Sequence, residues 1–119
     1  MSALDVDYLQ IEEDVRRRQQ LRKFLMNRRS RVGPVELGLP LTARRRVAGL
    51  RRGEVAELVG VTVDWYRSFE SGRAVRVSAQ FVARLSKALR LSAAEQFALF
   101  RLAFPEIYHL EITETQIVA

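Results

Sequence analysis

Apolar residues recur at helical spacing along most of the chain, and this pattern predicts five helices. The predicted segments are residues 8–31, 54–59, 62–71, about 79–90 and 92–103. Gly33-Pro34 is expected to end the first helix, because proline disfavours helical geometry in the residue before it. Pro105 is expected to end the last helix. The pattern therefore predicts an all-α fold of five helices with a long N-terminal helix.

The two short central helices are predicted to be joined by a tight turn. Gly60 has no Cβ and can adopt the left-handed backbone that a helix exit needs. Thr62 is suited to cap the second helix, and Asp64 places a carboxylate in its first turn. Ala56 is expected where the two helices cross most closely. The apolar side chains expected to pack between them are Val55, Val59, Val61, Tyr66 and Phe69. This combination predicts a helix-turn-helix, with an ordinary helical hairpin as the alternative.

Charge is strongly segregated along the chain, beyond what the net charge of +6 conveys. All 20 Lys and Arg residues lie between residues 16 and 104, whereas both ends of the chain carry acids and no bases. Only Lys23 and Lys87 are lysine, so the basic residues are nearly all arginine. Arginine's planar fork suits two-point contact with phosphate or guanine. A basic middle between acidic ends is typical of a polyanion-binding domain.

The runs EVAELVGVT at residues 54–62 and WYRSFESGR at residues 65–73 resemble the Xre-type helix-turn-helix of phage lambda repressor and many bacterial regulators. More narrowly, LRKFLMNRRSRV, ELGLP and GLRRGEVAELVGVTVDWY resemble the N-terminal DNA-binding domain of MmyB-like regulators. The resemblance covers roughly residues 20–104 and implies a lambda-repressor-like fold and a regulator that binds double-stranded DNA. That family usually continues into a ligand-sensing domain, which the chain does not contain, so a small-molecule ligand is not expected.

The helix over residues 62–71 is then expected to enter the major groove of DNA. Arg67 is the best candidate to read a base, because arginine can bridge O6 and N7 of guanine. Val63 is suited to a thymine methyl group, and Ser68 to a base edge or a phosphate. Asp64 either accepts from a cytosine amine or only caps the helix, and we favour the cap. Glu70 is expected to orient an arginine rather than to read a base.

The phosphate backbone is expected to be contacted by residues around this helix. Arg52, at the start of the first short helix, matches a backbone-contacting position of the Xre-type pattern. Trp65 is suited either to the sugar-phosphate wall or to a partly buried packing role. Residues 38–49 lack a clear period and are interpreted as a basic arm or a packed surface loop. The remaining candidates for backbone contact are Arg44, Arg45, Arg46, Arg51, Arg73 and Arg76.

Both ends of the chain are expected to serve assembly. The organisation predicted is a helical extension over residues 1–19, a DNA-binding domain over 20–104 and a tail over 105–119. Residues 107–118 carry β-branched residues in partial alternation, which permits a strand, with a disordered tail as the alternative. A helix-turn-helix usually binds as a two-fold dimer. A homodimer through the C-terminal helix and tail is therefore predicted.

Other functional classes are disfavoured by what the sequence lacks. His109 is the one histidine, no nucleophile motif surrounds it, and no enzyme, cofactor or metal site is predicted. No segment is long and apolar enough for a membrane helix, and the absence of cysteine fits a reducing bacterial cytoplasm, where the protein would associate with the nucleoid. The alternative function is a protein-interaction module, an antitoxin or accessory regulator that binds a partner protein through its two ends.

Overall fold

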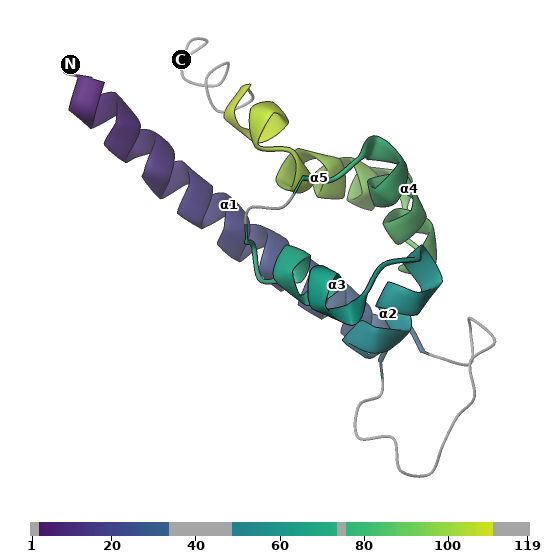
Figure 1. Ribbon diagram of the computed structural model, residues 1–119. Coiled ribbons are helices and arrows are strands. Elements are labelled where there is room, and N and C mark those ends of the chain that lie inside the picture. The colour runs from purple at the N-terminus through teal and green to yellow at the C-terminus, as the bar shows by residue number, and fades with distance from the viewer. Residues whose placement is uncertain (1–2, 34–48, 74–75, 111–119) are drawn as a thin grey trace.

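A computed structural model describes residues 3–33, 49–73 and 76–110, and these residues are helical with short connections (Figure 1). The helices are α1 (Ala3–Arg31), α2 (Arg52–Val59), α3 (Val63–Glu70), α4 (Ala79–Ala88) and α5 (Ala93–Ala103). One further short helix runs over residues 105–110. Within the described part of the chain there is no strand. The predicted all-α fold with a long first helix is confirmed.

Local sequence signals set the helix boundaries. The side chains of Thr62, Ser78 and Ser92 each accept a hydrogen bond from a backbone N–H of the first turn of α3, α4 and α5. Gly60 ends α2 in the left-handed region, with φ of 78°. The next N–H, that of Val61, donates back to the carbonyl of Ala56 at 3.0 Å, which closes the helix end. Gly60 and Thr62 together set where α2 ends and α3 begins.

A single apolar core joins the five labelled helices. The predicted stripe on α4, formed by Phe81, Val82, Leu85 and Leu89, is buried. The predicted contacts between α2 and α3 are confirmed, because Val55, Val59, Tyr66 and Phe69 are buried and Val61 is half-buried. On α5 the buried residues are Leu99, Leu102 and Ala103. Phe97, which the sequence places among the apolar groups of this helix, is 68% exposed.

Helix α1 is packed along one half of its length. Leu21 and Leu25 are buried, as their spacing predicts, and α1 contacts α3 and α5. Ile11 and Val15 have the same helical spacing but are exposed. The first turns of α1 project past the other labelled helices (Figure 1), whereas Asp14, further along α1, meets His109 of the helix over residues 105–110 at 3.0 Å.

The C-terminal segment differs from the predicted strand. Residues 105–110 form a helix, and the N–H groups of Ile107 and Tyr108 donate to the carbonyl of Phe104 at 3.1 Å. Pro105 ends α5 as expected, but it also fits the first turn of the helix that follows, where no N–H is needed. The partial alternation of apolar residues does not by itself decide between a strand and a helix. Burial of Tyr108 stabilises the helix. Residues 111–119 lie outside the described residues, as do residues 38–48 of the basic arm expected over 38–49.

None of the helices within the described ranges combines the length and apolarity that crossing a lipid bilayer requires.

Gly49 and Gly53, near the start of α2, give a matched test of how closely the backbone before α2 approaches α1. A Cβ on Gly49 would meet the backbone oxygen of Arg29 and lie 2.5 Å from Cα of Ser30, whereas a Cβ on Gly53 would meet nothing within 4 Å. We expect Gly49→Ala to lower the free energy of unfolding by about 3 kcal/mol, because backbone cannot yield as a side chain can. Gly53→Ala should raise it by about 0.5 kcal/mol. Urea unfolding followed by circular dichroism measures both free energies. Equal effects of the two substitutions would contradict the close approach of Gly49 to the backbone of Arg29 and Ser30.

Candidate nucleic-acid interface

Helix α3 has one buried and one exposed face. Tyr66 and Phe69 point into the core, and α2 packs against α3 on that side. Val63, Asp64 and Arg67 are exposed, and Ser68 is half-buried. The four residues predicted to read bases therefore lie where a molecule outside the domain can reach them.

Arg67 and Asp64 form an ion pair on this exposed face. Arg67 Nη1 lies 3.2 Å from Asp64 Oδ1, one helical turn away, and the two side chains are 57% and 87% exposed. An exposed pair of this kind contributes little to stability. The cap of α3 is instead the hydroxyl of Thr62, which accepts from the N–H of Trp65 at 3.1 Å. Asp64 therefore pairs with Arg67 and does not cap the helix.

An open hollow of about 510 Å³ lies beside the exposed face of α3. Besides α3, three other places in the sequence line it: α1 contributes Arg22, the start of α2 contributes Arg52, and Arg73 follows the turn at Gly72. The α3 residues that line the hollow are Asp64, Arg67, Ser68 and Ser71. Four arginines against one aspartate give it a positive charge. Such a hollow is suited to a polyanion.

The buried carboxylate of Glu70 bonds to α1 and to the start of α2, which form two walls of the hollow beside α3. Glu70, at the end of α3, is fully buried and receives two hydrogen bonds from Arg29 of α1. The distances are 2.9 Å from Arg29 Nε to Oε2 and 2.7 Å from Arg29 Nη2 to Oε1. Arg52 Nε also donates to Oε1, at 3.1 Å. Glu70 thus ties α1 and the start of α2 to α3, and it orients arginines as the sequence predicts.

Opposing effects act on the ionisation of Glu70. Burial by itself would raise the pKa of the Glu70 carboxyl, but the hydrogen bonds and positive charges supplied by Arg29 and Arg52 outweigh it and hold the pKa below its usual range. Burial raises the pKa of the neighbouring Tyr66 hydroxyl, and the Glu70 charge raises it further. Glu70 is therefore a carboxylate at neutral pH, although it has no exposed surface.

Trp65 takes the packing role that the sequence left open. It is half-buried, and its ring is stacked on Phe69 with centroids 5.8 Å apart. It also meets Phe81 of α4 edge to face at 4.8 Å. These rings hold α3 against α4. A contact between Trp65 and the DNA backbone stays a prediction.

The other predicted backbone contacts are spread around the domain. Arg51 is exposed at the N-cap of α2, where its N–H donates to the Glu54 carboxylate at 2.8 Å. Arg76 is exposed before α4 and does not line the hollow beside α3. Arg44, Arg45 and Arg46 lie outside the described residues. Of the predicted backbone residues, the structure brings Arg52 and Arg73 together with the exposed face of α3.

Sequence reasoning missed the part that α1 plays. Arg22 and Arg29 are seven residues apart, two helical turns, so they share a face, and this spacing is the signal that was available. Other α1 arginines bind backbone carbonyls instead of facing solvent. Arg17 Nη1 donates to Leu102 O at 2.9 Å, and Arg28 donates to the carbonyls of Leu89 and Arg90 at 3.0 and 2.7 Å. Positive side chains there satisfy carbonyls at helix C-termini.

The fold and the basic hollow define a helix-turn-helix protein. A model of the helix-turn-helix domain family matches residues 36–99, which is more than half of the 119 residues. The chain belongs to this family, whose members are typically DNA-binding. No curated protein and no solved structure matches the chain. The narrower likeness to Xre-type and MmyB-like regulators stays a prediction.

The Glu70 cluster predicts a pH-dependent stability. Glu70→Gln should lower the free energy of unfolding by about 3 kcal/mol near neutral pH, because it leaves the half-buried Arg29 charge without its partner. The folded pKa of Glu70 lies below the ordinary value of 4.5, so its stabilisation is present above pH 4.5 and is lost as pH falls through the folded value. Urea unfolding at a series of pH values should show the gap between the two proteins narrowing below pH 4.5.

Glu57→Gln, a change at an exposed position of α2, serves as the control and should alter stability little at any pH. A gap for Glu70→Gln that stays constant down to the lowest pH at which the protein folds would show that the charge of Glu70 is not what stabilises the contact.

Proposed function

We propose that the protein is a sequence-specific transcriptional regulator that binds double-stranded DNA with α3 in the major groove. The observation that carries this proposal is the exposed face of α3, with Arg67 at its centre, beside the hollow lined by Arg22, Arg52 and Arg73. The buried face of α3 is fixed by the core, so the exposed face is presented as a rigid surface. Membership of the helix-turn-helix family supports DNA as the partner.

Within this proposal, α3 supplies the base contacts. Arg67 has the length and donor geometry to bridge O6 and N7 of guanine. Without DNA its guanidinium pairs with Asp64 at 3.2 Å, and both side chains stay largely exposed. Val63 and Ser68 flank it for apolar and hydroxyl contacts. Asp64 additionally sets a preference, since a carboxylate accepts from a cytosine amine and is repelled by phosphate.

The arginines around α3 supply phosphate contacts. Arg52 and Arg73 line the hollow, and Arg22 is added to the residues that the sequence indicated. Arg51 and Arg76 extend the positive surface at either side, and Arg44 to Arg46 are proposed to reach the backbone from the connection before α2. Such contacts set the register of α3 on the duplex and carry no sequence information directly.

A homodimer on an inverted repeat is the proposed assembly. One helix in one groove reads few base pairs, and paired half-sites about 34 Å apart are usual for this motif. Exposed apolar side chains support an interface at the C-terminal end, where Phe97 is 68% and Leu110 60% exposed. The N-terminal half of α1 adds Tyr8 and Ile11, each 61% exposed. The domain over residues 20–104 would bind DNA while the flanking segments join the two copies.

The proposal is tested by selecting bound sequences from a randomised duplex pool with wild-type protein and with Arg67→Ala. The wild type should enrich an inverted repeat. Arg67→Ala should lose discrimination at one base pair of each half-site, by about 1–3 kcal/mol, and keep the rest of the repeat. Unchanged discrimination would remove Arg67 from base reading, and absence of any enrichment by the wild type would overturn sequence-specific binding.

Arg73→Ala is the matched comparison, because Arg73 is exposed and lies in the same hollow. It should weaken binding to all duplex sequences alike and reduce the slope of log affinity against log salt by about 1. Arg52 is less suited to this test, since its bond to Glu70 adds a change in stability. Fluorescence anisotropy at several salt concentrations measures the slope, and a loss of discrimination in Arg73→Ala would contradict the assignment.

A further inference from the structure

An open hollow of about 750 Å³ lies between α2 and the C-terminal half of α4. Its apolar floor consists of Leu58 of α2, Ala88 of α4 and Leu91, which follows α4. Leu58 is 42% exposed, and Ala88 and Leu91 are half-buried, so water reaches all three. A hollow of this size with an apolar floor is suited to receive side chains of a partner.

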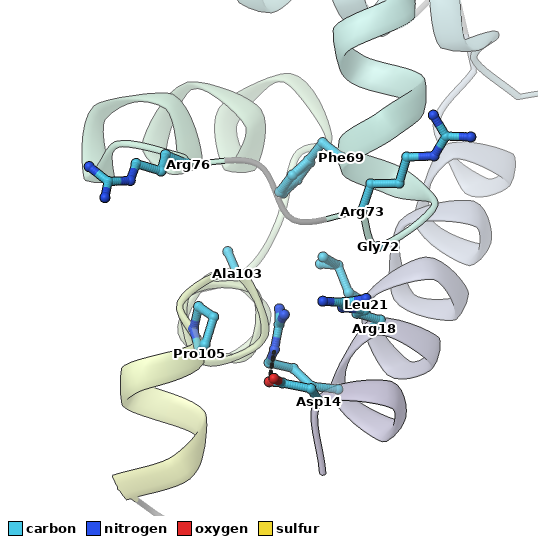
Figure 2. A pocket seen from close by; sticks show the side chains of 10 residues that line it. Asp14, Arg18, Leu21, Phe69, Gly72, Arg73, Arg76, Ala103 and Pro105 are labelled. Carbon is cyan, nitrogen blue, oxygen red and sulfur yellow. Dashed lines mark ion pairs between the residues drawn. The ribbon is translucent and has the colours of Figure 1, made fainter. Parts of the chain in front are cut away.

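The hollow between α1 and the end of α5, of about 360 Å³, offers a partner less. Figure 2 shows Arg73 and Arg76 extending away from it at its rim. The Arg17 side chain in its wall is 8% exposed and already donates to Leu102 O. These charges are turned to solvent or used within the fold, and the hollow between α2 and α4 is therefore the better surface for a partner.

The hollow between α2 and α4 carries a row of positive charge beside its apolar floor. Arg84 and Lys87 lie about one turn apart on α4, and Arg90 follows the C-cap of that helix. All three residues of this basic row are exposed, and no acid of the described residues lines the hollow. Cations at this spacing complement carboxylates that recur with each turn of a partner helix.

Arg90 occupies a backbone conformation that favours glycine. Its φ is 53°, and it is the one non-glycine residue with a positive φ in the described part of the chain. The N–H groups of Arg90 and Leu91 donate to the carbonyls of Lys87 and Ser86, which closes the end of α4. Glycine is usual at this place because it has no Cβ. The sequence therefore has a cation where glycine would fit the backbone better.

The basic row and its apolar floor are separate from the proposed DNA-binding surface. The hollow shares no described lining residue with the hollow beside α3. Arg52 lines the hollow beside α3 at the start of α2, whereas Leu58 lies about 9 Å further along the axis of that helix. The two surfaces therefore use different residues.

We propose that the hollow between α2 and α4 binds an acidic amphipathic helix of a partner protein. Apolar side chains one turn apart on the partner rest on the apolar floor, and carboxylates on the flanking positions pair with the basic row. Charge complementarity selects an acidic partner, and the floor selects one with apolar side chains, which a DNA backbone lacks. This site goes beyond the proposed function and does not depend on DNA binding.

The test is fluorescence anisotropy with a labelled synthetic helix that carries leucine on one face and glutamate on the other. The protein should bind this peptide saturably, with an affinity that falls as salt is raised, because the ion pairs are exposed. A peptide with lysine in place of each glutamate should not bind. A peptide with serine in place of each leucine should bind about ten-fold more weakly or less. No saturable binding of the leucine–glutamate peptide, or equal binding of the lysine peptide, would overturn the proposal.

The two lysines of the chain give matched variants that locate the site. Lys87 belongs to the basic row, whereas Lys23 is exposed on α1 and does not line the hollow. Lys87→Gln should weaken peptide binding about three- to five-fold, as expected for the loss of an exposed ion pair. Lys23→Gln makes the same change in net charge and should bind as the wild type does. Equal affinities of the two variants would contradict the site.

Arg90→Gly separates a binding role from a structural one. It should weaken peptide binding about three- to five-fold, because it removes one cation of the basic row. It should also raise the urea concentration at the midpoint of unfolding, because glycine adopts the positive φ without strain. A more stable Arg90→Gly that binds the peptide as tightly as the wild type does would exclude Arg90 from the site.

A short labelled duplex serves as the last arm, since phosphates also pair with cations. Its affinity for Lys87→Gln and for the wild type should be equal. If Lys87→Gln loses duplex binding and keeps peptide binding, the basic row belongs to the DNA interface and the proposal is wrong. Because the peptide arm contains no DNA, its result stands even if the protein does not bind DNA. Failure of this proposal and failure of the proposed function can therefore be told apart.

Discussion

The arrangement of this domain depends on one buried carboxylate. Glu70 sits at the end of α3 without exposed surface, and it is the point at which α1, α2 and α3 are joined by charged hydrogen bonds. A carboxylate buried without partners is strongly destabilising, so the loss of Arg29 would lower the stability of the fold. Apolar packing brings the helices together, and the bidentate bond from Arg29 to Glu70 adds a directional contact between α1 and α3.

Arginines of α1 differ in what their charge contacts. Arg17, Arg28 and Arg29 bind carbonyls or a carboxylate within the domain, whereas Arg22 lines the hollow beside α3. A count of positive charge along the sequence treats these residues as equal. The charge that faces a ligand is smaller and more localised than the net excess between residues 16 and 104 indicates. In the proposed function, the arginines that bind DNA are those that line the hollow beside α3, and Arg52 among them also bonds to Glu70.

Features that depend on residues close together in the sequence could be predicted, whereas contacts between distant residues could not. Thr62, Ser78 and Ser92 cap the helices that they precede, and Gly60 closes α2, because each acts within a few residues of itself. The pairing of Glu70 with Arg29 spans 41 residues, and several arginines of α1 were equally plausible partners. Exposure of Ile11 and Val15 could not be predicted from spacing, since the helical period reports a shared face and not what covers it. The helix over residues 105–110 was missed because β-branched alternation is weak evidence when one buried side chain, Tyr108, decides the packing.

We propose that α3, tied to α1 and α2 by Glu70, presents its exposed face to DNA. The measurement to make is a map of amide chemical-shift changes when a short duplex is added to isotopically labelled protein. The largest changes are expected at Val63 to Ser68 and around Arg22 and Arg73, with the Arg29 side-chain resonance unmoved because its bond to Glu70 is kept. Changes centred on the N-terminal half of α1 and on residues 97–110, with α3 unaffected, would contradict it.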